Sequence, residues 1–390
     1  MLNLRLLLRT KNPLNFLKIG NEDGRVMRLL LVLPQRPPRG GSTQRARLWG
    51  HTPVDIGTPS PSQWMVSLSN RQMSLEGLRD QVEEALENFV QDRLTKNDAP
   101  AMSLARDLLL SGGKRYRPIV ALLAYQAAGG KDLDSVMDLA LASELIHTAT
   151  LIHDDINDQA KTRRGLPTLH SAHSQSHGII AGDYLFVLGF GLGGKFDARI
   201  VDRMAETSAN IAAGELLQIK HIADLATTPE DYYAIIDGKT AGPFASACSC
   251  AAMQADAEKT IVDTLDDFGW EVGRAFQLVD DLLDLTGDPS MGKPRGTDVH
   301  EGKMTLPIIH ALTMLHGAER EQLADVLQNF SDDRWGELTE LLESAGSFEY
   351  AKQLIQNHID RAQESLESLP DTDAKALMIE IAKLSRGRRT

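Results

Sequence analysis

Two copies of the pattern Asp-Asp-x-x-Asp constrain what this chain can fold into: DDIND at residues 154–158 and DDLLD at residues 280–284. Each copy lies on an apolar segment with helical periodicity, and aspartates four residues apart share one face of a helix. Six carboxylates on two facing helices would repel one another at neutral pH if nothing lay between them. One such cluster fits a solvated helix face equally well, but two copies, each followed by cationic residues, favour a fold with cations between them.

The chemistry of the carboxylates indicates which cation is expected. Hard oxygen ligands favour Mg²⁺, which keeps part of its water shell and completes its coordination with substrate phosphates. We therefore expect several Mg²⁺ ions between the two helices, with a diphosphate or triphosphate bound through them. The candidate metal ligands are Asp154, Asp155, Asp158, Asp280, Asp281 and Asp284.

A second set of residues supplies positive charge to an otherwise acidic chain. The segment SGGKRYRP at residues 111–118 places three cations after a flexible glycine pair and before an apolar helix, as expected for an anion-binding helix entrance. Any one lysine could belong to an ordinary surface, but the set indicates two anionic groups, one bound through metal and one bound directly. Its members are Lys114, Arg115, Arg117, Arg163, Arg164, Lys239, Lys293 and Lys303.

The composition favours helices. Of the 390 residues 42% are apolar but only 5% are aromatic, so the core must be mostly aliphatic and alanine-rich, which suits close helix packing. From Ser74 onward apolar residues recur at steps of three and four, and no comparable run of strict alternation appears. We therefore predict an all-α, antiparallel helix bundle in a single domain at residues 65–390.

Residues 1–64 differ from the rest of the chain. The net charge is −13, but residues 1–60 alone carry +7, so the remainder carries −20 and should repel nucleic acid. Clustered Pro, Gly and Ser in this basic segment predict poor order. Three interpretations are open: an organelle-targeting peptide, a disordered basic tail, or an extension upstream of a working start near Met65 or Met73.

Two features bear on the cellular compartment. The longest apolar run near the start, LLLVL at residues 29–33, is far too short to span a bilayer. Cys248 and Cys250 would point about 200° apart on a helix, which supports neither a disulfide nor a four-ligand zinc site, and we interpret them as buried thiols in a reducing compartment. We expect a cytoplasmic protein, or a mitochondrial or other organellar one if residues 1–60 are a targeting peptide.

A series of motifs follows between about Gly112 and Pro307: GGKRYRP, ELIHTATLIHDDIND with RRG, GDYLF, GELLQ, GKTAGPF, FQLVDDLLDLTGD and GKPRGTDVHEGKMTLP. In this order, with both aspartate clusters intact, they resemble the all-trans polyprenyl diphosphate synthases. The resemblance implies a helix bundle of the isoprenoid synthase type with a central active-site cavity. It also implies a homodimer packed through long helices, and the apolar product predicts at most transient membrane association.

The resemblance assigns roles to individual residues. Both aspartate clusters match motifs that bind Mg²⁺ and the allylic diphosphate. The positions that hold the diphosphate of isopentenyl diphosphate are matched by Lys114, Arg117, His147 and Arg164. Those on the allylic diphosphate are matched by Arg163, Lys239 and Lys293, with Lys303 in the same shell. Lys239, Thr240 and Gln277 are the candidate catalytic residues, the last two beside the reacting groups.

The implied reaction joins isopentenyl diphosphate to an allylic diphosphate. Cations stabilise the departing diphosphate, so the allylic carbon–oxygen bond ionises and the double bond of isopentenyl diphosphate attacks the carbocation. Loss of a proton then gives a product that is longer by one isoprene unit. The bound diphosphate is the candidate base, so neither His147 nor His153 is assigned that role.

The product length is expected to depend on the helix of the first cluster. Thr150 lies one turn before Asp154 on the same face, and Ala149 precedes it. In the family that the sequence resembles, bulky aromatic residues four or five positions before this cluster stop chain growth early. The small residues here predict a product of at least twenty carbons, with Tyr184, Phe186 or a deeper residue setting the limit.

Two other functions compete with this interpretation. A class I terpene cyclase shares the helical fold and the ionisation step, but it has no need for a second diphosphate site, which Lys114 and Arg117 indicate. A noncatalytic regulatory subunit of a heteromeric synthase is the alternative from a different class. Such subunits typically lose aspartates or cations that this chain keeps.

Overall fold

The computed structural model describes residues 16–20, 26–30, 73–287 and 295–384. The chain divides into two compact units, Met1–Trp64 and Met65–Thr390. In the first unit, strands β1 (Phe16–Gly20) and β2 (Val26–Leu30) pair antiparallel, an element that the sequence did not predict. The other residues of the segment for which poor order is expected lie outside the described residues, and that expectation stays a prediction.

The described part of the second unit is helical apart from one pair of two-residue strands, which confirms the all-α class. Its first half comprises α2 (Leu75–Leu94), α3 (Ala99–Leu109), α4 (Tyr116–Ala127), α5 (Asp134–Asn157), β3 (Thr162–Arg163), β4 (Leu166–Pro167), α6 (Leu169–Ala172), α7 (Gln175–Gly193) and α8 (Ala198–Lys220). Its second half comprises α9 (Pro229–Ile236), η1 (Asp237–Ala241), α10 (Gly242–Gln254), α11 (Lys259–Thr286), α12 (Thr297–His300), α13 (Leu306–Met314), α14 (Gly317–Gln328), η3 (Asp332–Arg334), α15 (Trp335–Ser344), α16 (Ser347–Ser365), η4 (Leu366–Ser368) and α17 (Asp373–Leu384).

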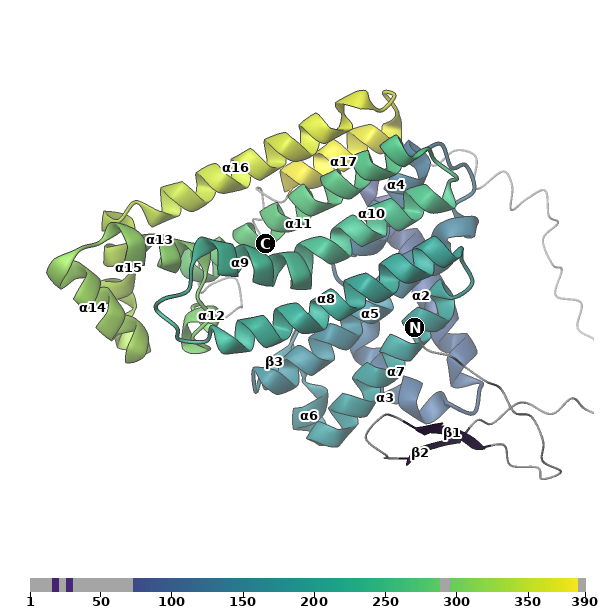
Figure 1. Cartoon of the computed structure of the whole chain (residues 1–390), viewed down its shortest axis with the longest axis horizontal. Helices are drawn as coiled ribbons and strands as arrows, with labels where there is room; N and C mark the ends of the chain where they lie inside the picture. The colour runs from purple at the N-terminus through teal and green to yellow at the C-terminus, as the bar shows by residue number, and fades with distance from the viewer. Residues whose placement is uncertain (1–15, 21–25, 31–72, 288–294, 385–390) are drawn as a thin grey trace, which may run out of the picture. The chain divides into compact units, whose positions relative to one another are not determined.

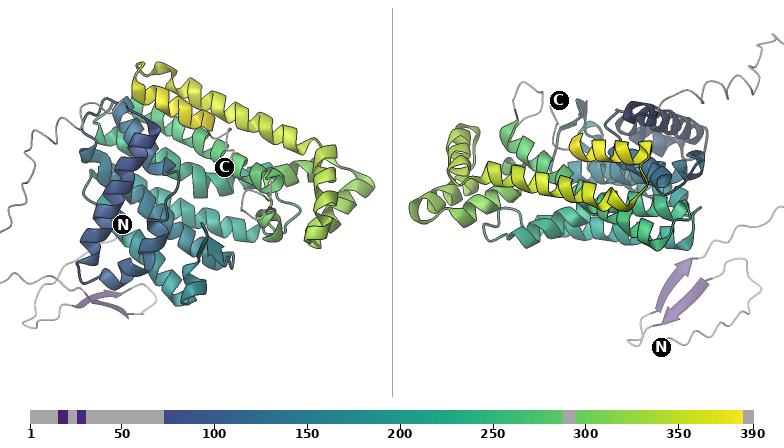
Figure 2. Two further views of the ribbon diagram at one scale, coloured as in Figure 1. Left: turned by 180° about the vertical axis from the view of Figure 1, so that it is seen from behind. Right: turned by 90° about the horizontal axis from the view of Figure 1, so that it is seen from above.

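The long helices form a layered bundle. Figure 1 shows α8, α10, α11 and α16 side by side in that order, and each contacts its neighbour. Helix α5 packs against α7, α4 and α10, so it lies inside the bundle. The left view of Figure 2 shows α16 and α17 (yellow) together along the upper edge. This arrangement surrounds the helix of the first aspartate cluster with other helices.

Helix α5 is apolar because it is a core helix. It is the only helix among the described residues that is long and apolar enough to cross a membrane, yet 56% of its most apolar window is buried inside the protein. Leu145 and Ile152 are almost fully buried, and each stabilises the fold by about 1.5–3 kcal/mol. Burial of most of its surface explains why α5 is apolar although it spans no membrane.

Close packing of α7 on α5 depends on glycine. A Cβ atom at Gly182 would lie 2.2 Å from Nε2 of His153, and one at Gly189 would lie 2.8 Å from Cγ1 of Ile146. Both distances are shorter than real carbon contacts, so larger side chains would push the helices apart. The glycines of α7 therefore bring it directly against α5, beside the first aspartate cluster.

Candidate active site

The three aspartates of the first cluster lie at the end of α5 and have different environments. Asp155 is buried, and its Oδ1 accepts a hydrogen bond of 2.6 Å from Nε of Arg163. Asp158 accepts one of 3.2 Å from Nζ of Lys303. Asp154 shares a helix face with Asp158, four residues away. Asp155 therefore anchors an arginine, while Asp154 and Asp158 form a separate pair.

Asp281 is the buried member of the second cluster and is held by two donors. The hydroxyl of Tyr232 donates to its Oδ2 at 2.6 Å, and Nε2 of Gln277 donates to its Oδ1 at 2.8 Å. The hydroxyl of Thr240 in turn donates to Oε1 of Gln277 at 2.9 Å. The two candidate catalytic residues at positions 240 and 277 are thus joined to each other and to the second aspartate cluster.

The other two members of this cluster differ again. Both carboxylate oxygens of Asp284 accept backbone amides, from Thr297 at 3.0 Å and from Asp298 at 3.1 Å, so Asp284 caps the start of α12. Asp280 is exposed at the surface of α11. Of the second cluster, Asp280 is therefore the member that an incoming ligand reaches most easily.

Lys303 links the first cluster to the segment that follows the second. Its Nζ lies 3.2 Å from Asp158 of the first cluster and 3.7 Å from Asp298. The backbone amide of Asp298 donates to Asp284 of the second cluster. The same Nζ also lies 2.5 Å from Glu301. Asp298 and Glu301 are site residues that the sequence did not identify, although both stand in the motif that ends at Pro307.

The carboxylates of this site are crowded and largely buried. Burial raises the pKa of Asp154 from 3.8 to about 6, and the positive charge of Lys239 opposes the rise only in part. Burial and the negative charge of Asp298 also raise the pKa of Asp281. A charged carboxylate in such surroundings is costly unless a cation lies beside it. The site as folded therefore favours the binding of further positive charge.

The donor set fits a hard divalent cation. Every acidic group described here offers carboxylate oxygens, which Mg²⁺ and Ca²⁺ prefer. Across residues 73–287 and 295–384, however, no three acidic, histidine or cysteine side chains are grouped closely enough to hold an ion by themselves. A metal ion at this site would therefore complete its coordination with water or with phosphate oxygens, as Mg²⁺ commonly does.

A separate group of cations lies beside His147. The positive charges of Arg117 and Arg164 contribute, after burial, to a pKa of His147 well below its usual 6.5, so the imidazole is neutral at physiological pH. Nη1 of Arg164 donates to the carbonyl of Gly112 at 2.5 Å and to Oγ of Ser111 at 3.2 Å. The glycine turn before α4 and the arginine pair after α5 thus meet, although they are far apart in the sequence.

Arg115 does not belong to this anion-binding group. Its side chain is fully buried, and its Nε donates to Glu83 at 2.8 Å while its Nη1 donates to Glu144 at 2.5 Å. Its Nη2 donates to the carbonyl of Leu109. The expectation that all three cations of SGGKRYRP face an anion is therefore wrong for Arg115, because two carboxylates already neutralise it.

Lys239 and Thr240 stand on a π-helical turn, η1, between α9 and α10. Nζ of Lys239 donates to Oε1 of Gln218 at 3.1 Å and pairs with Glu215, both on α8. Thr240 instead reaches Gln277 on α11. Glu215 and Gln218 were missed as site residues, although the motif GELLQ that contains them was recognised.

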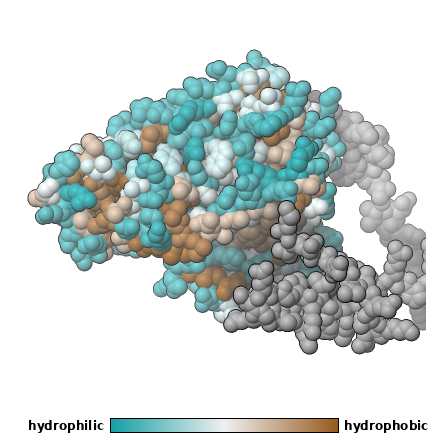
Figure 3. Space-filling model, viewed as in Figure 1, coloured by the Kyte–Doolittle hydropathy of each residue, from teal (hydrophilic) through white to brown (hydrophobic). Residues whose placement is uncertain are grey.

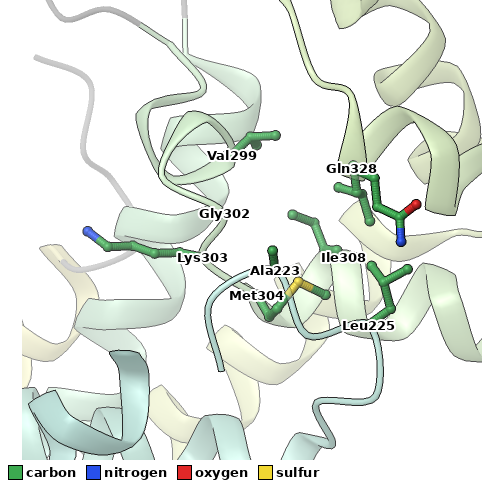
Figure 4. Close-up of a pocket in the computed structure, with 9 residues that line it drawn as sticks. Ala223, Leu225, Val299, Gly302, Lys303, Met304, Ile308 and Gln328 are labelled. Carbon is green, nitrogen blue, oxygen red and sulfur yellow. The ribbon is translucent and has the colours of Figure 1, made fainter. Parts of the chain in front are cut away.

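An apolar pocket lies behind Lys303. Figure 4 shows the amine of Lys303 pointing away from Ala223, Met304 and Leu225, which line the pocket. The backbone amide of Ala223 donates to the carbonyl of Gly302 at 2.8 Å, which ties the loop after α8 to the segment of Lys303. The pocket therefore belongs to the support of this lysine rather than to the charged site.

Comparison with known proteins decides the family. Residues 100–343 match the sequence profile of the polyprenyl synthetases. The chain is 32% identical over 306 residues to an all-trans-nonaprenyl-diphosphate synthase (geranyl-diphosphate specific) of Rhodobacter capsulatus, covering 78% of this chain and 94% of the relative. The chain belongs to the polyprenyl synthetase family. It is a prenyltransferase, which confirms the enzyme class expected from the motifs.

Further members of the polyprenyl synthetase family agree with this assignment. An octaprenyl diphosphate synthase of Escherichia coli K12 is 34% identical over 285 residues, covering 71% of this chain and 87% of the relative. A crystal structure of polyprenyl synthase from Caulobacter crescentus CB15, complexed with calcium and isoprenyl diphosphate, superposes with a TM-score of 0.76 at 31% identity. The structural similarity thus covers 82% of this chain and all of that one.

The residues expected to set product length in this synthetase lie on two helices. Ala149 is fully buried, whereas Thr150 is half-buried and its hydroxyl donates to the carbonyl of His147 on its own helix. The hydroxyl of Tyr184 donates to Asp98 at 2.9 Å, and Phe186 packs on the core. Lys293, expected on the allylic diphosphate, lies outside the described residues.

Proposed function

We propose that this polyprenyl synthetase is a Mg²⁺-dependent trans-prenyltransferase that condenses isopentenyl diphosphate with an allylic diphosphate. The observation that supports it most strongly is that Lys303 links the first aspartate cluster to the segment capped by the second. Its Nζ lies 3.2 Å from Asp158 and 3.7 Å from Asp298, whose backbone amide donates to Asp284. The cations Arg117 and Arg164 beside His147 support a second diphosphate site. An elongating enzyme needs two diphosphate sites, whereas a terpene cyclase needs only one.

The metal would be held by the accessible carboxylates. Asp154 and Asp158 on one face of α5, with Asp280 on α11, are the proposed ligands. Asp155 is held by Arg163, and both oxygens of Asp284 accept backbone amides, so these two would orient the site. Asp158 also pairs with Lys303 but by one oxygen, and it would offer the other to the metal. When bound, Mg²⁺ supplies positive charge that stabilises a departing diphosphate. The raised pKa of Asp154 supports this, because a cation would relieve the cost of its buried charge.

The protein's own groups would bind and orient the two substrates. Lys114, Arg117, His147 and Arg164 are proposed to hold isopentenyl diphosphate, with neutral His147 as a hydrogen-bonding partner rather than a charge. Lys239, with Arg163 and Lys293, is proposed to hold the allylic diphosphate. The allylic carbon–oxygen bond ionises, the double bond of isopentenyl diphosphate attacks the cation, and the released diphosphate takes the proton. Thr240 and Gln277 would lie beside these groups.

We propose a product of twenty carbons or more. Asp154, Thr150, His147 and Ser143 share one face of α5, and each is half-buried although the helix lies inside the bundle. The hydroxyl of Thr150 is satisfied by its own helix, so its methyl group is available to line an apolar path. No bulky side chain stands at Ala149 or Thr150 to block such a path.

We also propose that the enzyme is a homodimer. Val187 of α7 and Leu216 of α8 are each 69% exposed, and these helices contact each other. The exposed face of α8 carries apolar residues at alternating steps of four and three, the spacing that packs against another helix: Ala205, Ala209, Ala212, Leu216 and Ile219. Figure 3 shows an apolar band over α8. A second copy would cover this band.

A cytoplasmic location is proposed on the cysteines. Cys248 and Cys250 are buried free thiols, and burial raises the pKa of Cys250 to about 11, so neither is reactive. Unpaired buried thiols are compatible with a reducing compartment. Import into an organelle directed by residues 1–60 is the alternative, which fusion of those residues to a fluorescent protein would test.

The function is tested by incubating purified protein with Mg²⁺, labelled isopentenyl diphosphate and geranyl, farnesyl or geranylgeranyl diphosphate. Chromatography of the dephosphorylated products should show labelled polyprenols of twenty carbons or more. Shorter products would overturn the proposed length. No incorporation by folded protein with any primer would instead favour a noncatalytic subunit of a heteromeric synthase, and co-purified partners would then be sought.

A further inference from the structure

The π-helical turn η1 separates two neighbouring side chains that the reaction uses. Lys239 reaches α8, where it meets Glu215 and Gln218, while Thr240 reaches Gln277 on α11. The π turn is closed by the amide of Gly242, which donates to the carbonyl of Asp237 five residues earlier. Such turns are rare and are frequently found at functional sites. Something in the fold must therefore hold this one in place.

A two-point contact joins the start of the turn to α11. Nε and Nη2 of Arg274 each donate to one carboxylate oxygen of Asp237, both at 2.8 Å. Both side chains are about three-quarters buried. The guanidinium also lies over the rings of Tyr233 and Trp270, at 6.0 and 5.6 Å from their centroids. A parallel pair of charge-assisted hydrogen bonds fixes direction as well as distance.

The contact between Arg274 and Asp237 joins η1 to α11, and so does the hydrogen bond between Thr240 and Gln277. The spacing along the chain is the same in both elements. Asp237 and Thr240 are three residues apart on η1, and their partners Arg274 and Gln277 are three residues apart on α11. A displacement of η1 along α11 would therefore strain both contacts together. The ion pair thus restricts the register in which Thr240 meets Gln277.

The packing around the turn leaves it no free space. A Cβ at Gly273 of α11 would lie 2.5 Å from Cα of Ala241, and one at Gly238 would lie 2.7 Å from the carbonyl of Asn210 on α8. The turn is therefore clamped between two helices. Small changes in the angle of η1 would move Lys239 and Thr240 relative to α8 and α11.

The ion pair is itself held from α16. Oε1 of Glu271 accepts a hydrogen bond of 3.1 Å from Nη1 of Arg274, and Oε2 of Glu271 lies 2.6 Å from Nδ1 of His358. His358 also contacts the hydroxyl of Tyr233 at 3.0 Å. These contacts hold the guanidinium of Arg274 in place against Asp237.

We infer that Arg274, through its paired hydrogen bonds to Asp237, is a positioning residue that sets the π turn on which Lys239 and Thr240 stand. The inference rests on the roles proposed above for those two residues. In this inference Arg274 and Asp237 do not touch a substrate. They keep Lys239 and Thr240 in position relative to α8 and α11. The isopentenyl diphosphate group around His147 stands on α4, α5 and the segment after α5 rather than on η1, so its affinity for that substrate should change little.

The test is steady-state kinetics of Arg274→Gln, Asp237→Asn and the double variant, with each substrate varied in turn. We expect kcat/KM for the allylic diphosphate to fall by about 10-fold to 100-fold, because slight misplacement of reacting groups has effects of this size. KM for isopentenyl diphosphate should stay within about twofold. The double variant should be no worse than either single one, and Arg274→Lys should recover part of the loss.

A matched control is an ion pair between α8 and α11. Nη2 of Arg203 donates to Asp266 of α11 at 2.7 Å, and this pair is about as buried as Arg274 and Asp237. Arg203→Gln should lower thermal stability to a similar extent without changing either KM. Equal effects of Arg203→Gln and Arg274→Gln on every kinetic parameter would overturn the inference, as would an unchanged kcat/KM for Arg274→Gln.

Lys239→Met, measured in the same assay, distinguishes the role proposed for Lys239 from the positioning role of Arg274. If Lys239→Met raises KM for the allylic diphosphate and Arg274→Gln does not, the positioning role is wrong and the role of Lys239 stands. If Lys239→Met changes neither kcat nor KM, the role proposed for Lys239 is wrong and the positioning inference is overturned with it.

Discussion

Nζ of Lys303 lies 3.2 Å from Oδ2 of Asp158, so a lysine that follows the second aspartate cluster touches the first. Asp298 and Glu301 surround the same amine. These opposite charges raise the pKa of Lys303 above its usual value, although burial opposes the rise. A single ammonium group therefore supplies part of the positive charge that this site needs when no ligand is bound.

Replacing Lys303 should destabilise the metal-free protein. Lys303→Met leaves Asp158, Asp298 and Glu301 without their shared partner, and an unpaired buried charge of this kind costs about 1–3 kcal/mol. Thermal unfolding with EDTA should show the lower Tm. Saturating Mg²⁺ with inorganic diphosphate should reduce the difference, whereas an equal loss of Tm with and without these ligands would contradict the role of the lysine.

Mg²⁺ should stabilise the protein more at neutral than at acidic pH. The pKa of Asp154 rises from 3.8 to about 6, so between these values the folded protein holds a proton that the unfolded chain has lost, and the free energy of unfolding falls as pH rises. Bound Mg²⁺ favours the charged form and opposes that loss. Mg²⁺ should therefore raise Tm more at about pH 7.5 than at about pH 5. Asp154→Asn should make the rise in Tm caused by Mg²⁺ less dependent on pH. A rise that is independent of pH in the unsubstituted protein would contradict the proposed role of Asp154 as a metal ligand.

Thr150→Phe should shorten the product. The new ring would stand one turn before Asp154 on the same face of α5 and obstruct a growing chain there. Chromatography of the polyprenols should show fewer isoprene units with the total turnover largely kept. Thr150→Val, which changes the volume little, should leave the product length unchanged. A Thr150→Phe enzyme with the original products would show that this face does not line the path.

Charges on the exposed face of α7 and α8 should separate the proposed dimer. Val187→Glu combined with Leu216→Glu places two carboxylates in an apolar band, and burial of unpaired charge opposes association. Light scattering after gel filtration should report a monomer. Met314→Glu introduces the same charge at a 54% exposed methionine on α13 and should leave the mass unchanged. If the unsubstituted protein is a monomer, the homodimer proposal is wrong.

Gly182→Ala should test the contact between α5 and α7. The added methyl would lie 2.2 Å from Nε2 of His153, beside Asp154, so the helices must separate, at a cost of about 1–3 kcal/mol. Both Tm and activity should fall. Gly336→Ala places a methyl where no atom lies within 4 Å and should lower neither. An unchanged Tm for Gly182→Ala would show that α7 can shift away without penalty.

Much of the fold could be predicted because it depends on patterns between residues that are close together in the sequence. The three-and-four spacing of apolar residues from Ser74 onward specifies helices without reference to distant parts of the chain. Asp154 and Asp158 share a face on any helix that contains them. The charged residues and their order along the chain were sufficient to predict the family, whereas the metal-bound diphosphate site that they indicate stays a prediction.

Other features depended on partners that are remote in sequence. Arg115 stands in the same motif as Lys114 and Arg117, yet the fold places it against Glu83 and Glu144, so it is structural. No local pattern distinguishes a cation that faces a ligand from one that neutralises buried carboxylates. The π turn at Lys239 was likewise not predictable, because its neighbours on α8 and α11 determine its conformation.

The sequence by itself determined the all-α class, the two aspartate clusters and the cations that make this chain a polyprenyl synthetase. These follow from helical periodicity and from the kinds and order of the charged residues, which can be read directly along the chain. The tertiary structure alone decided which carboxylates are engaged by Arg163, Tyr232 and backbone amides, and how Arg274 meets Asp237. Such roles arise from burial and from distances between segments far apart in sequence, which local patterns do not encode.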